Sequence, residues 1–161
     1  MSGSRGFTLI ELMIALVIAG VVLSVGMPAF GRLRDTLVLR QAGTQLLQDV
    51  RRARQLAVTR RAPVVIKFGT PPSTTDITTY EIHVDTNADN VAQTSETRTL
   101  RQLPRGTQLD RVTMISQVDT LTFDISGTLK LGTQGGTLVY SNPAGQRDSL
   151  VVSAAGICYH P

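Results

Sequence analysis

The feature that most constrains this chain is an uncharged apolar run that begins close to the amino terminus. Counting from Leu12 to Phe30 gives 19 residues without a charge. As a helix rising about 1.5 Å per residue, the run would extend roughly 28 Å, close to the thickness of the hydrocarbon core of a bilayer. The sequence therefore predicts an apolar helix over residues 7–30 that spans a membrane once.

The residues before this run are in the opposite order from a cleavable secretory signal. A secretory signal has a shorter apolar stretch, and a small-residue cleavage site follows it. Here the small residues and the basic Arg5 come first. The order argues against an ordinary signal peptide.

Glu11 is the residue that a simple membrane anchor would not contain. A carboxylate in hydrocarbon is costly unless it is paired or reaches the interface, so such a residue is a functional hypothesis. Glu11 is therefore a candidate functional residue. The alternative is a side chain that reaches back to the lipid headgroups.

Gly6, Phe7 and Glu11, in register with the apolar helix, resemble the class III leader of type IV pilins and type II secretion pseudopilins. Pro28 lies where many pilins carry a proline. The resemblance implies that a prepilin peptidase cuts between Gly6 and Phe7, that residues 1–6 are lost and that Phe7 is N-methylated. It also implies that Glu11 faces the amino terminus of a neighbouring subunit and guides subunits into a filament.

The following segment, residues 31–62, predicts an amphipathic stalk helix. Its apolar and small residues recur at steps of four and three, which places them on one face. We expect this face to lie on a sheet and the helix to end near Arg61, because Pro63 disfavours helical geometry at the residue before it. The face consists of Leu39, Gly43, Leu46, Val50, Ala53 and Ala57, opposite Gln41, Gln48, Arg52 and Gln55.

Residues 63–161 predict a head of short strands joined by turns. Ser126-Gly127 and Asn142-Pro143-Ala144-Gly145 have the residues of tight turns. One long helix followed by mostly antiparallel strands is an α+β arrangement. The expected strands are Val64–Phe68, Tyr80–Val84, Leu100–Leu103, Val112–Ile115, Leu121–Ile125, Gly127–Leu131, Leu138–Tyr140 and Leu150–Ser153.

Length and cysteine content set further limits. At 161 residues, the chain has room for one modest domain besides an anchor. A single cysteine, Cys158, excludes a disulfide within the chain. We interpret it as a small buried apolar residue, with a reactive thiol or an intermolecular bridge as the alternative.

The net charge of +4 is unevenly distributed. Residues 31–67 contain nine basic and two acidic residues, a net charge of +7, whereas residues 68–161 contain six basic and nine acidic residues, a net charge of −3. The basic charge therefore belongs to the stalk helix and its surroundings.

Beyond the leader, the chain resembles the GspH/FimT group of minor pseudopilins and minor pilins. The resemblance implies a structural subunit near the tip of a filament. Two functions stay open: a GspH-like minor pseudopilin that assists type II protein secretion, or a FimT/FimU-like minor pilin for pilus priming or DNA uptake. The similar segments are residues 50–58, 61–64, 84–87, 96–100, 121–123 with Gly127, and 151–153 with Gly156.

An acidic segment has the spacing of a calcium-binding loop. Asp85, Asn87, Asp89 and Glu96 occupy ligand positions of a twelve-residue loop, but Asn90 stands where such a loop needs glycine. The flanking segments are predicted strands instead of paired helices. An Asx-rich turn that closes a hairpin accounts for the same residues. We therefore expect no cofactor, and bound calcium is the alternative.

Arg51, Arg52 and Arg54 suggest a second alternative, an electrostatic contact with DNA phosphates. DNA-uptake receptors of the FimT branch carry a carboxy-terminal Gly-Arg-x-Arg pattern. Here Ile157 and Tyr159 fill the two arginine positions after Gly156. The departure weakens the DNA hypothesis.

The sequence shows no arrangement typical of an enzyme: His83 and His160 are far apart, and no phosphate-binding glycine loop is present. We expect a single-pass inner-membrane protein with its head in the periplasm. Its expected partners are other pilins or pseudopilins, the prepilin peptidase, the inner-membrane assembly platform and membrane lipid.

Overall fold

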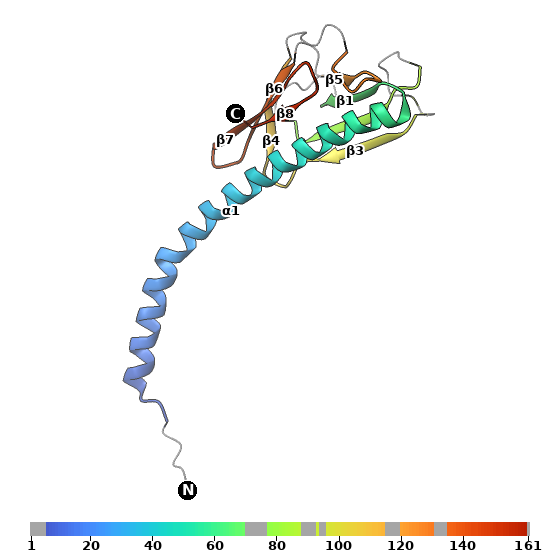
Figure 1. Cartoon of the computed structure of the whole chain (residues 1–161). Coiled ribbons are helices and arrows are strands. Elements are labelled where there is room, and N and C mark those ends of the chain that lie inside the picture. The colour runs from blue at the N-terminus through green and yellow to red at the C-terminus, as the bar shows by residue number, and fades with distance from the viewer. Residues whose placement is uncertain are drawn as a thin grey trace. The chain divides into compact units, whose positions relative to one another are not determined.

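The computed structural model describes residues 6–69, 77–87, 93, 96–114, 120–130 and 135–160. It divides into two compact units, Met1–Asp35 and Thr36–Pro161. One helix, α1 (Leu9–Arg60), belongs to both units (Figure 1). The described strands are β1 (Val64–Phe68), β2 (Thr79–Val84), β3 (Arg98–Gln102), β4 (Gln108–Met114), β5 (Thr120–Phe123), β6 (Gly136–Ser141), β7 (Arg147–Val152) and β8 (Cys158–Tyr159).

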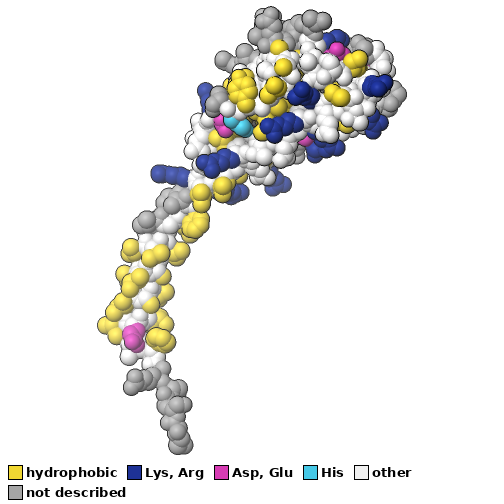
Figure 2. Space-filling view, viewed as in Figure 1, with side chains coloured by type: hydrophobic (Ala, Val, Ile, Leu, Met, Phe, Trp, Pro, Cys, Tyr) yellow, Lys and Arg dark blue, Asp and Glu magenta, His cyan; other side chains and the backbone are white. Residues whose placement is uncertain are grey.

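The first unit is the amino-terminal part of α1 with its apolar side chains in solvent. Phe7 is 88% exposed, and the large apolar residues from Leu9 to Leu33 whose side chains are described are more than half exposed. Hydrophobic side chains cover the visible face of this unit (Figure 2). Such a surface is typical of a segment that is covered by lipid or by other subunits.

The structure does not identify a membrane span. In the described part of the chain, no helix is both long and apolar enough to cross a bilayer. The side chains at positions 25, 28 and 29 lie outside the described residues. The single span expected over residues 7–30 stays a prediction.

The second unit contains two four-stranded sheets. The strand orders are β3-β2-β1-β5 and β4-β6-β7-β8, and all neighbouring strands are antiparallel. A bridge between Ile77 and Leu109, with N–O distances of 3.2 and 2.8 Å, joins the segment before β2 to β4. The predicted α+β class is confirmed.

The carboxy-terminal half of α1 packs on both sheets with the face that the sequence predicts. All six residues of that face are buried, and the four polar residues opposite are exposed. Gln45 donates a hydrogen bond to the carbonyl of Gln102 at 2.8 Å in the first sheet. Gly43 lies against Tyr140 of the second sheet. The helix ends at Arg60, and Arg61 leaves helical geometry with a φ of 51°.

The strand predictions hold for most of the chain and fail in two places. The strand expected over Gly127–Leu131 is wrong, because Gly127 turns with a φ of 76° and only Leu129 bridges to Phe123. The strand β8 was not predicted, because its two residues are too few to show an alternating pattern. β3 and β4 begin earlier than expected and β5 ends two residues earlier.

The turn expected at Asn142–Gly145 is confirmed between β6 and β7. The amide of Gly145 donates to the carbonyl of Asn142 at 3.0 Å, and Gly145 has a φ of 76°. The Asn142 side chain accepts from the amide of Gln146 at 3.0 Å and so holds the turn from within.

Gly43 permits the close approach of α1 to the second sheet. A Cβ at this position would collide with the hydroxyl oxygen of Tyr140, a fully buried side chain. That hydroxyl donates a hydrogen bond to Asp148 at 2.9 Å, so the buried ring cannot shift away from the helix without losing this bond. Burial, together with the Asp148 carboxylate, raises the pKa of Tyr140 and keeps the hydroxyl a donor.

We predict that Gly43→Ala destabilises the second unit by about 1–3 kcal/mol, although alanine is the better helix former, because the new methyl group overpacks a fixed contact. Thermal unfolding followed by circular dichroism should show a melting temperature roughly 4–10 °C lower. Gly31→Ala is the matched control: nothing lies within 4 Å of a Cβ there. A Gly43→Ala protein as stable as the Gly31→Ala protein would contradict the prediction.

Candidate functional site

The start of α1 is held by a reciprocal capping arrangement between Thr8 and Glu11. The Glu11 Oε2 atom accepts from the Thr8 amide at 2.9 Å and from the Thr8 hydroxyl at 3.0 Å. The Glu11 amide in turn donates to the Thr8 hydroxyl oxygen at 3.3 Å. This is the capping box expected of Thr-x-x-Glu, and the sequence prediction missed this second role of Glu11. Among the described residues, no donor reaches Glu11 Oε1.

The Gly6–Phe7 bond lies just before this cap. Gly6, Phe7 and Thr8 are exposed and outside the helix, whose first residue is Leu9. A peptidase needs an extended and accessible backbone, and a helical segment would have to unwind first. The geometry therefore suits cleavage at the predicted bond, and the capping box marks where α1 begins.

In the described residues of the Asp85–Glu96 segment, the Glu96 carboxylate is held by two backbone amides. Its Oε1 accepts from the Thr86 amide at 2.9 Å, and its Oε2 accepts from the Gln93 amide at 3.1 Å. These backbone hydrogen bonds, that from Gln93 first, lower the pKa of Glu96. Both oxygens are thus occupied by the loop itself, which favours the turn interpretation over the calcium interpretation.

Of the other proposed calcium ligands, only Asp85 and Asn87 are described, and they differ in exposure. Asp85 is fully buried, Asn87 is exposed, and Asp89 lies outside the described residues. Within the described ranges, no three His, Cys, Asp or Glu side chains are placed to hold a metal ion. Since Asp89 belongs to the predicted set, calcium binding stays a prediction.

The three arginines proposed for DNA have different surroundings. Arg54 is half-buried, and its Nε donates to the carbonyl of Gly127 at 3.0 Å. Arg51 lies near the thiol of Cys158, whose pKa is raised by burial and lowered in part by this arginine. Arg51 and Arg52 are exposed and Arg54 is not. The three arginines therefore differ in their surroundings and do not form one uniform phosphate-binding stripe. Cys158 itself is buried, as expected for a structural residue.

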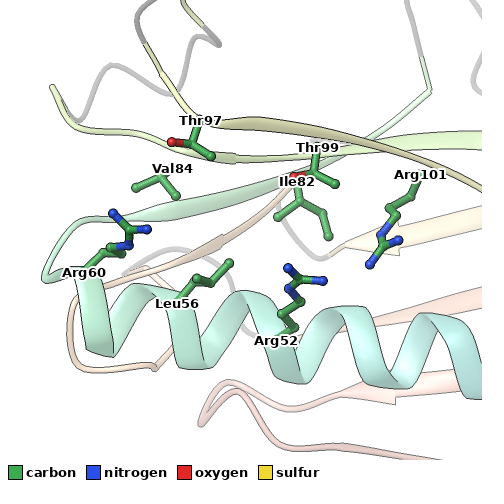
Figure 3. A pocket seen from close by; sticks show the side chains of 8 residues that line it. All are labelled: Arg52, Leu56, Arg60, Ile82, Val84, Thr97, Thr99 and Arg101. Carbon is green, nitrogen blue, oxygen red and sulfur yellow. The ribbon is translucent and has the colours of Figure 1, made fainter.

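The structure brings together a group of residues that the sequence did not connect. A cleft of about 140 Å³ lies between α1 and the strands β2 and β3. Figure 3 shows the side chains of Arg52 and Arg101 projecting into it from opposite walls, with Arg60 at its other end. We call it the arginine cleft; its lining is Arg52, Leu56, Arg60, Ile82, Val84, Thr97, Thr99 and Arg101. The sequence did not predict Arg60 and Arg101 as site residues, because their position in one cleft depends on the pairing of β3 with β2 beside α1.

Comparison with known families gives two matches along the chain. The family model described as type II transport protein GspH matches residues 42–156, more than half of the sequence. The prokaryotic N-terminal methylation motif matches residues 1–27. The chain belongs to the GspH family. No curated protein sequence matches it.

Solved structures share the fold of this GspH-family protein. Two crystal structures of the type IV minor pilin FimU from Pseudomonas aeruginosa match with TM-scores of 0.56 and 0.52. Their sequence identities are 22% and 21%. Both matches cover 76% of this chain, and they cover 87% and 92% of the FimU chains. At this identity the likeness shows the fold alone.

Family membership confirms the predicted GspH/FimT resemblance. The chain is a pilin-like protein with an N-terminal methylation motif, and its family consists of structural subunits that assemble with other pilins or pseudopilins. The motif covers Gly6, Phe7, Thr8 and Glu11, where the structure places the exposed bond and the helix cap.

We predict that Glu96→Gln lowers the melting temperature at neutral pH, because the amide accepts fewer of the hydrogen bonds that hold the 85–96 segment. The folded-state pKa of Glu96 lies below its ordinary value of 4.5, so its stabilising contribution is present above that value and is lost as the pH falls through the depressed one. Melting curves of the two proteins should therefore differ at pH 7 and converge in acid below pH 4.5.

Calcium or a chelator should leave both melting temperatures unchanged if Glu96 serves the turn alone. A rise with calcium in the unaltered chain and none in Glu96→Gln would support the metal site instead. Equal melting temperatures at pH 7 would contradict the role of Glu96 in the loop.

Proposed function

We propose that this chain is a minor pseudopilin of a type II secretion system, a structural subunit near the pseudopilus tip that assists protein secretion. The observation that carries the proposal is the match of the type II transport protein GspH model to residues 42–156. The methylation motif over residues 1–27 supplies the processing segment that such a subunit needs.

In this proposal, a prepilin peptidase removes residues 1–6, and Phe7 becomes the methylated amino terminus. Residues 7–30 anchor the protein once in the inner membrane, with the head in the periplasm, until the assembly platform extracts it. The exposed apolar side chains of α1 support this path. Stacking against neighbouring helices would keep them out of water, where exposure costs about 25 cal/mol per Å².

When the helix moves from the membrane into the filament, Glu11 supplies a polar contact with the neighbouring subunit. Its Oε2 is held by Thr8 and keeps the carboxylate oriented, whereas Oε1 is available to a neighbouring amino terminus. A carboxylate and an ammonium group that meet in an apolar bundle interact strongly, and either one alone is costly. The pair would therefore favour the one register in which the Glu11 carboxylate meets the amino terminus of the neighbouring subunit.

A FimU-like minor pilin of a type IV pilus is the second candidate, and the fold shared with FimU favours it. It would act in pilus priming, with Arg51, Arg52 and Arg54 as the residues for a DNA-binding version. Arg54 keeps its charge, but its Nε already donates to the carbonyl of Gly127, so one fewer donor is left for a phosphate in that version.

Deletion of the gene in its source bacterium tests the secretion role against the pilus role. We predict that the deletion strain retains folded exoproteins in the periplasm and that the unaltered gene restores their export. Twitching and uptake of DNA should be unaffected. Normal export combined with loss of pili or of transformation would reject the pseudopilin proposal in favour of the pilin.

We predict that Glu11→Ala reduces incorporation into filaments by roughly tenfold or more, because the neighbouring amino terminus is left without its partner. Sheared filaments probed with an antibody against the head would measure incorporation. The membrane fraction should still contain the protein, and mass spectrometry should show a mature chain that begins at Phe7.

Thr8→Val is the matched control for this experiment. It removes the hydroxyl of the helix cap and keeps the Glu11 charge, so incorporation should fall much less than in Glu11→Ala. Equal defects in the two variants would indicate that Glu11 acts through the cap alone. Normal incorporation of Glu11→Ala would contradict its role in assembly.

A further inference from the structure

The arginine cleft lies at the edge of the first sheet, where residues four apart on α1 face alternate residues of β3. Arg52, Leu56 and Arg60 are four residues apart on α1 and therefore lie along one line of the helix. On β3, alternate residues face α1: Thr99 pairs with Ile82, and Arg101 pairs with Tyr80. The lining of the cleft consequently comes from one line of the helix and from residues of β2 and β3 that face it.

The cleft carries three positive charges, of which the described residues pair only that of Arg101. Arg52 and Arg60 form no ion pair within the described ranges, and no acidic residue lines the cleft. Arg101 pairs with Asp49 at 3.2 Å through Nη2, while its buried Nε has no hydrogen-bond partner among the described atoms. The site thus presents two to three guanidinium groups to an incoming anion.

The floor of the cleft is apolar. Ile82 is buried, and Leu56 and Val84 are partly buried beneath the arginines. At about 140 Å³, the space is well below the roughly 300–1,000 Å³ typical of sites for drug-sized ligands. A single side chain with a short apolar stem and an anionic end matches both the size and the lining.

The open edge of β3 adds a way to hold a polypeptide there. β3 is the last strand of its sheet, and among the described residues no strand pairs with its outer edge. An extended segment can add to such an edge through backbone hydrogen bonds, while pockets receive alternate side chains. A nucleic-acid strand gains nothing from that edge or from the apolar floor.

We propose that the arginine cleft is a docking site for a glutamate or aspartate side chain on an extended segment of a partner protein. The carboxylate would accept hydrogen bonds from the guanidinium groups of Arg52 and Arg101, and planar guanidinium groups suit a carboxylate in two-point contact. The methylene stem would lie on Leu56 and Ile82. The inference does not depend on which filament the chain enters.

The test is a titration of the isotope-labelled full-length protein in detergent micelles, followed by NMR of the arginine Nε–H groups. The probe is the peptide acetyl-Thr-Val-Glu-Val-Thr-amide, and its glutamine counterpart is the neutral control. The glutamate peptide should shift the resonances of Arg52, Arg60 and Arg101 saturably. The glutamine peptide should bind about tenfold more weakly, because it lacks the charge-assisted hydrogen bonds.

Two variants distinguish binding in the cleft from attraction to the overall positive charge of the helix. Arg52→Gln should weaken binding of the glutamate peptide about tenfold, and its exposed side chain makes the fold insensitive to the change. Arg40→Gln removes the same charge from an exposed position elsewhere on α1 and should leave affinity unchanged. Equal weakening by both variants would overturn the proposal.

Inorganic phosphate and a single-stranded DNA oligonucleotide are the remaining probes. Phosphate that shifts the same three resonances with the affinity of the glutamate peptide would show a non-selective anion site and overturn the proposal. Shifts with DNA and none with the peptide would assign the cleft to nucleic acid instead. Equal binding of the two peptides, or no saturable shift with either, would also overturn it.

Discussion

The close packing of the second half of α1 on two sheets is the contact on which the rest of the head depends. Small side chains allow the helix its closest approach: Ala42, Ala53 and Ala57 are fully buried, and Gly43 lies against Tyr140. No disulfide within the chain can compensate for a looser fit, because Cys158 is the only cysteine. The stability of the head therefore rests on one helix face shared by two sheets.

The same packing accounts for the arginine cleft. A helix with side chains is about 10–12 Å wide, whereas neighbouring strands are about 4.8 Å apart, so one helix covers roughly two strands. In the first sheet, β1, β2 and β5 supply the buried residues, and β3 at the edge is largely exposed. The space between the edge strand and the helix is left for the long side chains of Arg52 and Arg101 to line.

The sequence predicts the parts of this fold that depend on local pattern. The helix face, the end of α1 before Pro63 and the strands β1 and β2 follow from periodicity and from proline geometry. The strand expected over Gly127–Leu131 fails because its residues bridge at only one point, and β8 is too short to leave a pattern. Thr-x-x-Glu at Thr8 and Glu11 has the pattern of a capping box, a role of Glu11 that is compatible with either of the two roles predicted from its charge.

The charges of the cleft could not be predicted in this way, because they depend on a buried network that joins distant segments. Asp49 on α1 accepts from the Tyr80 hydroxyl at 2.5 Å and pairs with Arg101. Burial, and then the neighbouring Asp49, raise the pKa of Tyr80, so the phenol stays protonated and continues to donate. The carboxylate of Asp49 is thereby committed to the interface between helix and sheet. It cannot neutralise Arg52 as well, so the positive charge of the cleft is a consequence of how the core is held together.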